Sequence, residues 1–205
     1  MRDLPVVWFQ SVLIAFLGTP RSGTKWVSAV MRSFGLDVRH ETMGSNGTAC
    51  GFAAWSHPLP ITRQDVRGVE FTHRYHLCRD PLATMRTMPE VLATADVWQP
   101  WFVANGFHPE GPWDSKLASL RYWVATRRFL IAQGLPVFRV DRADEDWPMV
   151  AADLGLGELP EIEPSNKRPP FWTPTWDDLA AVDEIAAKSA RGISAALGYS
   201  CKVSM

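Results

Sequence analysis

The chain has few cysteines, no excess of either charge and no hydrophobic run long enough to cross a membrane. Its 3 cysteines, at positions 50, 78 and 201, are scattered and show no metal-ligand spacing. This pattern favours free thiols in a reducing compartment, and we expect a cytoplasmic protein. With 21 Lys and Arg against 22 Asp and Glu, the formal net charge is −1, which argues against a general nucleic-acid binder. A site for an anion must therefore be built locally.

The N-terminal apolar stretch, residues 6–17, is interrupted by Gln10 and is shorter than the roughly 20 residues of a membrane-spanning helix. It also lacks the small-residue cleavage site of a signal peptide. We therefore predict no membrane span and assign residues 12–17 to a buried strand. A chain of 205 residues is long enough to bury a substantial core, and we expect residues 1–205 to form a single domain.

The predicted first strand runs directly into a loop that is typical of phosphate binding. Gly18 and the segment 20–26 supply small and polar residues, and apolar residues then recur at helical spacing as far as Phe34. Such a loop lets successive backbone N–H groups turn toward one anion beside the positive end of a helix. The nucleotide triphosphatase pattern needs lysine directly after the second glycine. Thr24 stands there instead, which makes a poor magnesium-nucleotide site.

A second motif follows another predicted strand, residues 69–78. Arg79 stands at the end of this strand, Pro81 is suited to the first turn of a helix, and Thr87 comes eight residues after Arg79. We expect Thr87 to lie about two turns along this helix, so that a guanidinium group and a hydroxyl group converge on one phosphate.

Together the two motifs resemble those of sulfotransferases that use 3′-phosphoadenosine-5′-phosphosulfate (PAPS). The first is similar to the family's 5′-phosphosulfate loop, P-(K/R)-S-G-T-(T/S)-W, with lysine in place of one hydroxyl residue, and the second to its 3′-phosphate motif, R-(N/D)-P-x-x-x-x-x-(S/T). The resemblance implies a small soluble bacterial-type enzyme that transfers a sulfuryl group from PAPS, without a metal, to a hydroxyl or amine of a small-molecule or glycan acceptor. It implies these cofactor-binding residues: Pro20, Arg21, Ser22, Gly23, Thr24, Lys25, Trp26, Arg79 and Thr87.

Two further likenesses concern the nucleotide. Lys167 and Arg168 loosely resemble a late basic segment that closes over the 3′-phosphate in this family. Trp26 matches a tryptophan that stacks on adenine, although its spacing also suits a core position of the helix.

In-line sulfuryl transfer requires charge stabilisation at the departing phosphate and a base for the acceptor proton. Arg21 and the loop N–H groups are suited to the first task. Two residues compete for the second. Glu41 resembles the strand-end glutamate of some bacterial and carbohydrate sulfotransferases, whereas His57, in the segment 56–60, resembles the catalytic histidine of the T-H-x-P segment in cytosolic members.

Hydrophobic periodicity in the rest of the chain predicts a three-layer α/β/α domain of the P-loop type with a mostly parallel central sheet. Residues 36–40 and 135–140 are predicted strands, and residues 145–154 a short helix. Residues 42–51, rich in Gly, Ser and Thr, are predicted to form a loop that borders the active crevice.

Two longer helices are expected in the second half. Asp114 or Ser115 is suited to cap the first, and Gly134 to end it. The second is expected to run unbroken from a capping box at 175–178 to Gly198. The arginines of the first helix are predicted to lie on a solvated face, or one of them to help bind an anion: Arg121, Arg127 and Arg128.

Two other functions fit the same chain. A small-metabolite kinase needs a magnesium-binding aspartate, for which Asp141 is the candidate. A protein that binds the nucleotide or a partner without catalysis needs no base.

The aromatic residues within 98–113 indicate either a satellite hydrophobic cluster or a wall over an acceptor.

Overall fold

The structure is a computed structural model that describes residues 12–51, 69–93, 103, 110–163 and 172–201. Three predicted site residues, His57, Lys167 and Arg168, lie outside these ranges. Within them, no helix is long and apolar enough to span a membrane.

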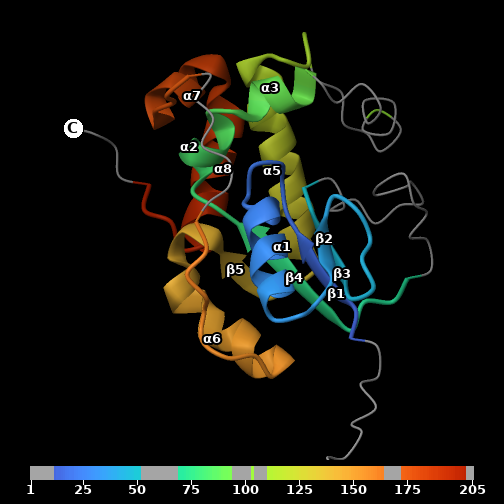
Figure 1. The fold of residues 1–205 in the computed structure, drawn as a ribbon. Coiled ribbons are helices and arrows are strands. Elements are labelled where there is room, and N and C mark those ends of the chain that lie inside the picture. The colour runs from blue at the N-terminus through green and yellow to red at the C-terminus, as the bar shows by residue number, and fades with distance from the viewer. Residues whose placement is uncertain (1–11, 52–68, 94–102, 104–109, 164–171, 202–205) are drawn as a thin grey trace, which may run out of the picture.

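A five-stranded sheet lies at the centre of the described chain, and all of its strand pairs are parallel (Figure 1). The spatial order is β2-β3-β1-β4-β5, so the first strand in sequence is the middle strand of the sheet. The carboxyl ends of the strands meet at one edge, which is where ligands bind in sheets of this kind. The strands are β1 (Ile14–Leu17), β2 (Val38–His40), β3 (Gly47–Cys50), β4 (His73–Cys78) and β5 (Val137–Arg139).

Helices cover both faces of this sheet. Alternate residues of the strands point to opposite faces, so Phe16 and Tyr75 belong to the core on one side and Cys78 to the core on the other. The first core includes residues of α1 (Thr24–Ser33) and α6 (Ala143–Leu154). The second includes residues of α2 (Pro81–Met85), α3 (Met88–Ala93), α5 (Lys116–Ala132), α7 (Trp176–Val182) and α8 (Glu184–Ala196). The predicted three-layer α/β fold with a parallel sheet is confirmed.

Helix starts follow the local sequence. Ser115 Oγ accepts a hydrogen bond from Ala118 N at 3.0 Å and caps α5. Thr175 and Asp178 form the predicted capping box of α7. Pro81 occupies the first turn of α2. Each of these starts depends on side chains within three residues, which is why the sequence predicts them.

The predicted loop over 42–51 is wrong for its second half, which forms β3 between β2 and β1. All four residues of β3 are buried, and the strand has room only for small side chains. Gly47 has a φ of +127°, and a Cβ at this position would lie 1.9 Å from the carbonyl oxygen of Ile14. The small residues of β3, whose composition is typical of a loop, allow this strand to pack closely against β1.

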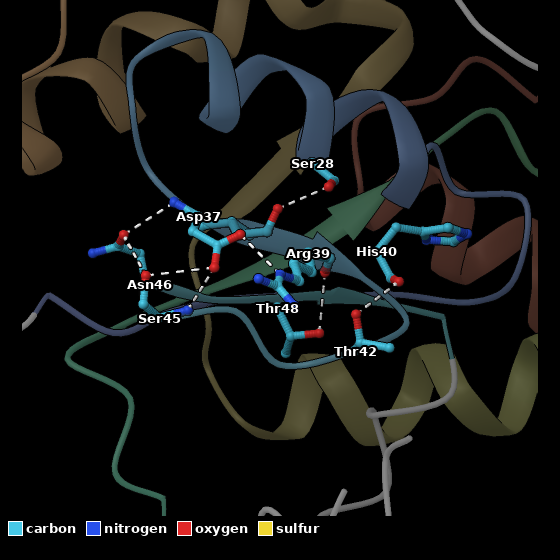
Figure 2. Close-up of polar contacts among 9 residues, drawn as sticks. Ser28, Asp37, Arg39, His40, Thr42, Ser45, Asn46 and Thr48 are labelled. Carbon is cyan, nitrogen blue, oxygen red and sulfur yellow. Dashed lines mark hydrogen bonds and ion pairs between the residues drawn. The ribbon is translucent and has the colours of Figure 1, made fainter. Parts of the chain in front are cut away.

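The chain returns from β2 to β3 through residues 41–46, a short connection for two parallel strands. Asp37 secures this connection (Figure 2). Its Oδ2 accepts a hydrogen bond from Ser45 N at 2.9 Å, and its backbone N–H donates to Asn46 Oδ1 at 3.0 Å. Its Oδ1 accepts from Arg39 Nε at 2.9 Å, and the pKa of the Asp37 carboxyl is lowered by the hydrogen bonds that it accepts, that from Arg39 first.

The predicted final helix is two helices, because Asp183 has an extended backbone with a φ of −161°. Its carboxylate accepts from Ala186 N at 3.0 Å, as the N-cap of α8, and pairs with Arg121 at 2.8 Å. Arg121 remains partly solvated, as predicted: its side chain is 31% exposed, and the exposed carboxylate of Glu110 lies 2.9 Å from its guanidinium.

The expected helix from Pro81 to Thr87 is interrupted as well. It ends at Met85, because Pro89 has no N–H to donate to the Met85 carbonyl. The Trp172 indole N–H donates to that carbonyl at 3.1 Å instead. Thr87 is therefore in the turn before α3, where only 8% of its surface is exposed.

Gly47→Ala is expected to lower the free energy of unfolding by at least about 3 kcal/mol, because it combines a disfavoured φ with a clash against the β1 backbone. Gly134→Ala is the matched control: its φ is +63°, and no atom lies within 4 Å of the added Cβ. This control should cost only about 1 kcal/mol. Urea unfolding of both variants measures the difference, and equal losses would contradict the close packing of β3.

Candidate functional site

The loop between β1 and α1 is packed tightly into the carboxyl edge of the sheet. Gly18 N donates to the Cys50 carbonyl at 3.1 Å, and Ser22 N donates to the Thr19 carbonyl at 3.1 Å. Gly23 is the N-cap of α1 with a φ of +93°, and a Cβ there would lie 2.7 Å from Val140 Cγ1. The N–H groups of the first turn of α1 have no partner within the helix, so they are available to an anion.

One residue of this loop and one residue beside it have strained backbones. Among the described residues, the non-glycine residues with positive φ are Arg21, at 69°, and Glu41, at 56°. This conformation costs of order 1–3 kcal/mol per residue and concentrates at functional sites. Both residues were predicted to be catalytic from the sequence.

The Glu41 carboxylate is held at the end of β2 by the end of β3. Its Oε1 accepts from Gly51 N at 3.0 Å, and its Oε2 accepts from Cys50 Sγ at 3.0 Å. Gly51 in turn packs against the loop after β1, since a Cβ there would lie 2.7 Å from Pro20 N. The side chain is 30% exposed, so Glu41 combines an ordered carboxylate with access to solvent beside the loop.

The sequence predicts that Arg127 lies on a solvated face. This prediction is wrong, because Arg127 is fully buried. Its Nη2 donates to Ser22 Oγ at 2.8 Å and to Thr19 Oγ1 at 3.0 Å, and its Nη1 donates to the Leu77 carbonyl at 2.6 Å. The side chain therefore joins α5 to β4 and to the loop after β1. The helical pattern contained a signal: Arg127 fills the gap at helical spacing between the apolar positions Val124 and Ile131.

His76, which sequence reasoning missed, is the buried neighbour of Arg127. Burial and then the Arg127 charge lower the pKa of His76 to about 2. The ring is therefore neutral, and since a guanidinium only donates, its Nε2 accepts from Arg127 Nη1 at 2.8 Å. The proton is on Nδ1, which has no hydrogen-bond partner among the described residues.

Arg79 is exposed at the end of β4, the strand next to β1. The chain after it is held by Asp141, whose Oδ2 accepts from Asp80 N at 3.0 Å and whose Oδ1 accepts from Tyr199 Oη at 2.8 Å. Burial and the nearby carboxylate of Asp141 raise the pKa of Tyr199 above its ordinary value, so the hydroxyl keeps its proton and donates. Asp141, the aspartate that a kinase would need, thus anchors the β4 end.

Other predicted loop residues divide between the interior and the surface. Ser22 and Thr24 are buried, with the Ser22 hydroxyl directed at Arg127, whereas Lys25 is exposed. Trp26 packs at the start of α1: its indole N–H donates to the Ile162 carbonyl at 2.9 Å, and its ring stacks with Phe138 at a centroid distance of 6.5 Å.

Comparisons of this chain with models of protein families, with curated proteins and with solved structures find no match. The arrangement of the site is therefore interpreted from its own chemistry. Over the ranges that the structure describes, no group of three or more His, Cys, Asp or Glu side chains is placed to hold a metal ion.

The neutral His76 is expected to make the protein less stable in acid. The unfolded chain binds a proton at this ring below a pH of about 6.5, whereas the folded protein does not until about pH 2. The unfolded state therefore binds more protons, and the contribution of His76 to the free energy of unfolding falls by about 2 kcal/mol from pH 6.5 to pH 5.

Urea unfolding at pH 7.5 and pH 5 tests this expectation. In His76→Gln the side chain at position 76 does not titrate, so this variant should lose less stability between pH 7.5 and pH 5 than the wild type. His40→Gln, which removes an imidazole from the exposed end of β2, is the matched control. The same pH dependence in His76→Gln and the wild type would show that the ring does not contribute.

Proposed function

We propose that this protein is a PAPS-dependent sulfotransferase. The observation that carries the proposal is the strained backbone of Arg21, within the loop after β1, and of Glu41, beside that loop at the carboxyl edge of a parallel sheet. Backbone strain persists only where surrounding contacts impose it, as the Gly51 and Cys50 bonds do at Glu41. A cation in an anion-binding loop and a carboxylate beside it suit group transfer with proton removal.

The nucleotide would be held from two adjacent strands. The loop after β1 and the first-turn N–H groups of α1 receive the 5′-phosphosulfate, and the exposed Lys25 adds a charge at the surface. Arg79 and Thr87, after β4, receive the 3′-phosphate. The parallel pairing of β1 with β4 supports this assignment, because it brings both motifs to one edge of the sheet.

In the proposed reaction, an acceptor hydroxyl attacks the sulfur of PAPS in line. The bond between sulfur and the 5′-phosphate oxygen breaks as the new sulfur–oxygen bond forms, and the acceptor proton passes to the Glu41 carboxylate. Arg21 and the loop N–H groups stabilise the negative charge that develops on the departing phosphate. The products are the sulfated acceptor and 3′-phosphoadenosine-5′-phosphate (PAP). Glu41 is proposed as the base because its carboxylate is oriented beside the loop.

Calorimetric titration with PAP in EDTA tests the nucleotide site. We expect micromolar binding, at least tenfold weaker binding of ADP, and loss of PAP binding in Arg79→Ala. Tenfold corresponds to about 1.4 kcal/mol. Arg74→Ala is the matched control, since it removes an exposed arginine from the opposite end of the same strand. Absent PAP binding, or equal binding of PAP and ADP, would reject the proposal.

Glu41→Gln tests the base. PAP release from PAPS, measured with a panel of phenol and sugar acceptors, should slow by about 10²–10⁴-fold, because the amide cannot take the acceptor proton. PAP affinity should not change. Glu158→Gln, at an exposed glutamate after α6, should keep the wild-type rate. His57→Gln serves as the competing variant: a rate loss in it, with full activity in Glu41→Gln, would assign the base to His57.

A further inference from the structure

Within the described ranges, the buried guanidinium of Arg127 is not paired with a carboxylate. The other described arginines that form ion pairs do so near the surface, as Arg39 does with Asp37 and Arg191 with Asp177. Arg127 is 0% exposed, and the groups that accept from it are neutral: the His76 ring, the Leu77 carbonyl, the Cys78 sulfur and two hydroxyls. No carboxylate among the described residues pairs with it, and burying an unpaired charge is unfavourable.

The hydroxyls of the phosphate loop are occupied by this side chain. Ser22 Oγ accepts from Arg127 Nη2 and, at 3.1 Å, from Thr19 N, so both of its lone pairs are used. Its own proton is then donated to Thr19 Oγ1, at 2.8 Å. The backbone N–H groups of Gly18, Thr19 and Ser22 also donate within the protein. A ligand is therefore left with the N–H groups of the first turn of α1, while the hydroxyls of Thr19 and Ser22 face the guanidinium behind the loop.

The guanidinium of Arg127 is the charged group of this buried cluster. The neighbouring His76 ring is neutral, because burial and then the Arg127 charge lower the pKa of His76. In a dry interior the attraction between this charge and an anion on the other side of the loop is screened less than at the surface.

We propose that Arg127 is the positioning residue of the phosphate loop and that the phosphate bound there is its missing counter-ion. The side chain holds Thr19 and Ser22, and the ligand completes an ion pair across the loop backbone. This inference rests on the proposed function only in requiring a phosphate group at the loop, whatever else the ligand contains.

Three variants separate charge from hydrogen bonding. Arg127→Gln removes the charge, Arg127→Lys keeps it and loses the planar fork, and Ser22→Ala removes one hydroxyl acceptor. The matched control is Arg128→Gln, at the next position of α5, where the exposed side chain bonds Ser189 at 2.9 Å. Each variant is titrated calorimetrically with PAP and with pyrophosphate, and its fold is checked by circular dichroism.

We expect Arg127→Gln, which loses the charge, to weaken pyrophosphate binding at least tenfold. Arg127→Lys and Ser22→Ala, which keep the charge and lose part of the hydrogen bonding, should weaken it by less than Arg127→Gln does, and Arg128→Gln should bind as the wild type does. Unchanged binding in Arg127→Gln, or equal losses in the Gln and Lys variants, would overturn the counter-ion role.

The two proposals can fail separately. Wild-type binding of pyrophosphate without PAP would reject the sulfotransferase and leave the Arg127 series as a valid test. Binding of PAP with an unaffected Arg127→Gln variant would reject only the inference about Arg127. Binding of neither compound would reject both.

If Arg127→Gln does not fold, a measurement on the wild type tests the same inference. The Arg127 Nε–H has no hydrogen-bond partner among the described residues, so its ¹⁵N resonance is sensitive to a nearby charge. Addition of pyrophosphate should shift this resonance, assigned by its absence in Arg127→Lys. An unchanged resonance at saturation would overturn the inference.

Discussion

The buried guanidinium of Arg127 determines how the parts of this site are arranged. A charge removed from water has to be surrounded by hydrogen-bond acceptors, and here these come from β4 and from the loop after β1. Because the guanidinium is planar, its directions fix the carbonyl of Leu77 and the hydroxyl of Ser22 relative to each other. The loop, the central sheet and α5 are thereby joined at one point that no hydrophobic contact could specify as narrowly.

Around this point, the functional edge is held by side chains that have no part in the proposed chemistry. Asp37 secures the connection after β2, which brings Glu41 to the edge, and Asp141 secures the chain after Arg79. Both carboxylates accept hydrogen bonds from backbone N–H groups. They thus supply acceptors that regular secondary structure would otherwise provide in these stretches. The strain at Arg21 and Glu41 is compatible with a stable fold because these neighbouring segments are fixed independently.

Local patterns predicted much of the fold. The first strand, its loop and α1, the Pro81 helix start and the caps at Ser115 and Thr175 depend on residues close in sequence, and the structure contains them. What sequence reasoning missed depends on distant partners. Arg127 is buried where groups of β4 and of the loop after β1 accept from it, and Asp183 interrupts the last helix while bound to Arg121. A residue's own sequence neighbourhood carries little sign of such partners, and the same holds for β3, whose small residues fit between two strands.

The position of β1 has a consequence for how the chain folds. This strand is synthesised before the other strands, yet it is the middle strand, and its second neighbour, β4, ends only at Cys78. Its apolar residues Ile14, Phe16 and Leu17 thus cannot be covered by a complete sheet until the ribosome has added the intervening chain. The guanidinium that supports the adjoining loop arrives later still, within α5. The strand β1 and its loop are therefore translated early but acquire their last contacts late. Their folding depends on contacts of high sequence separation, which makes it slow.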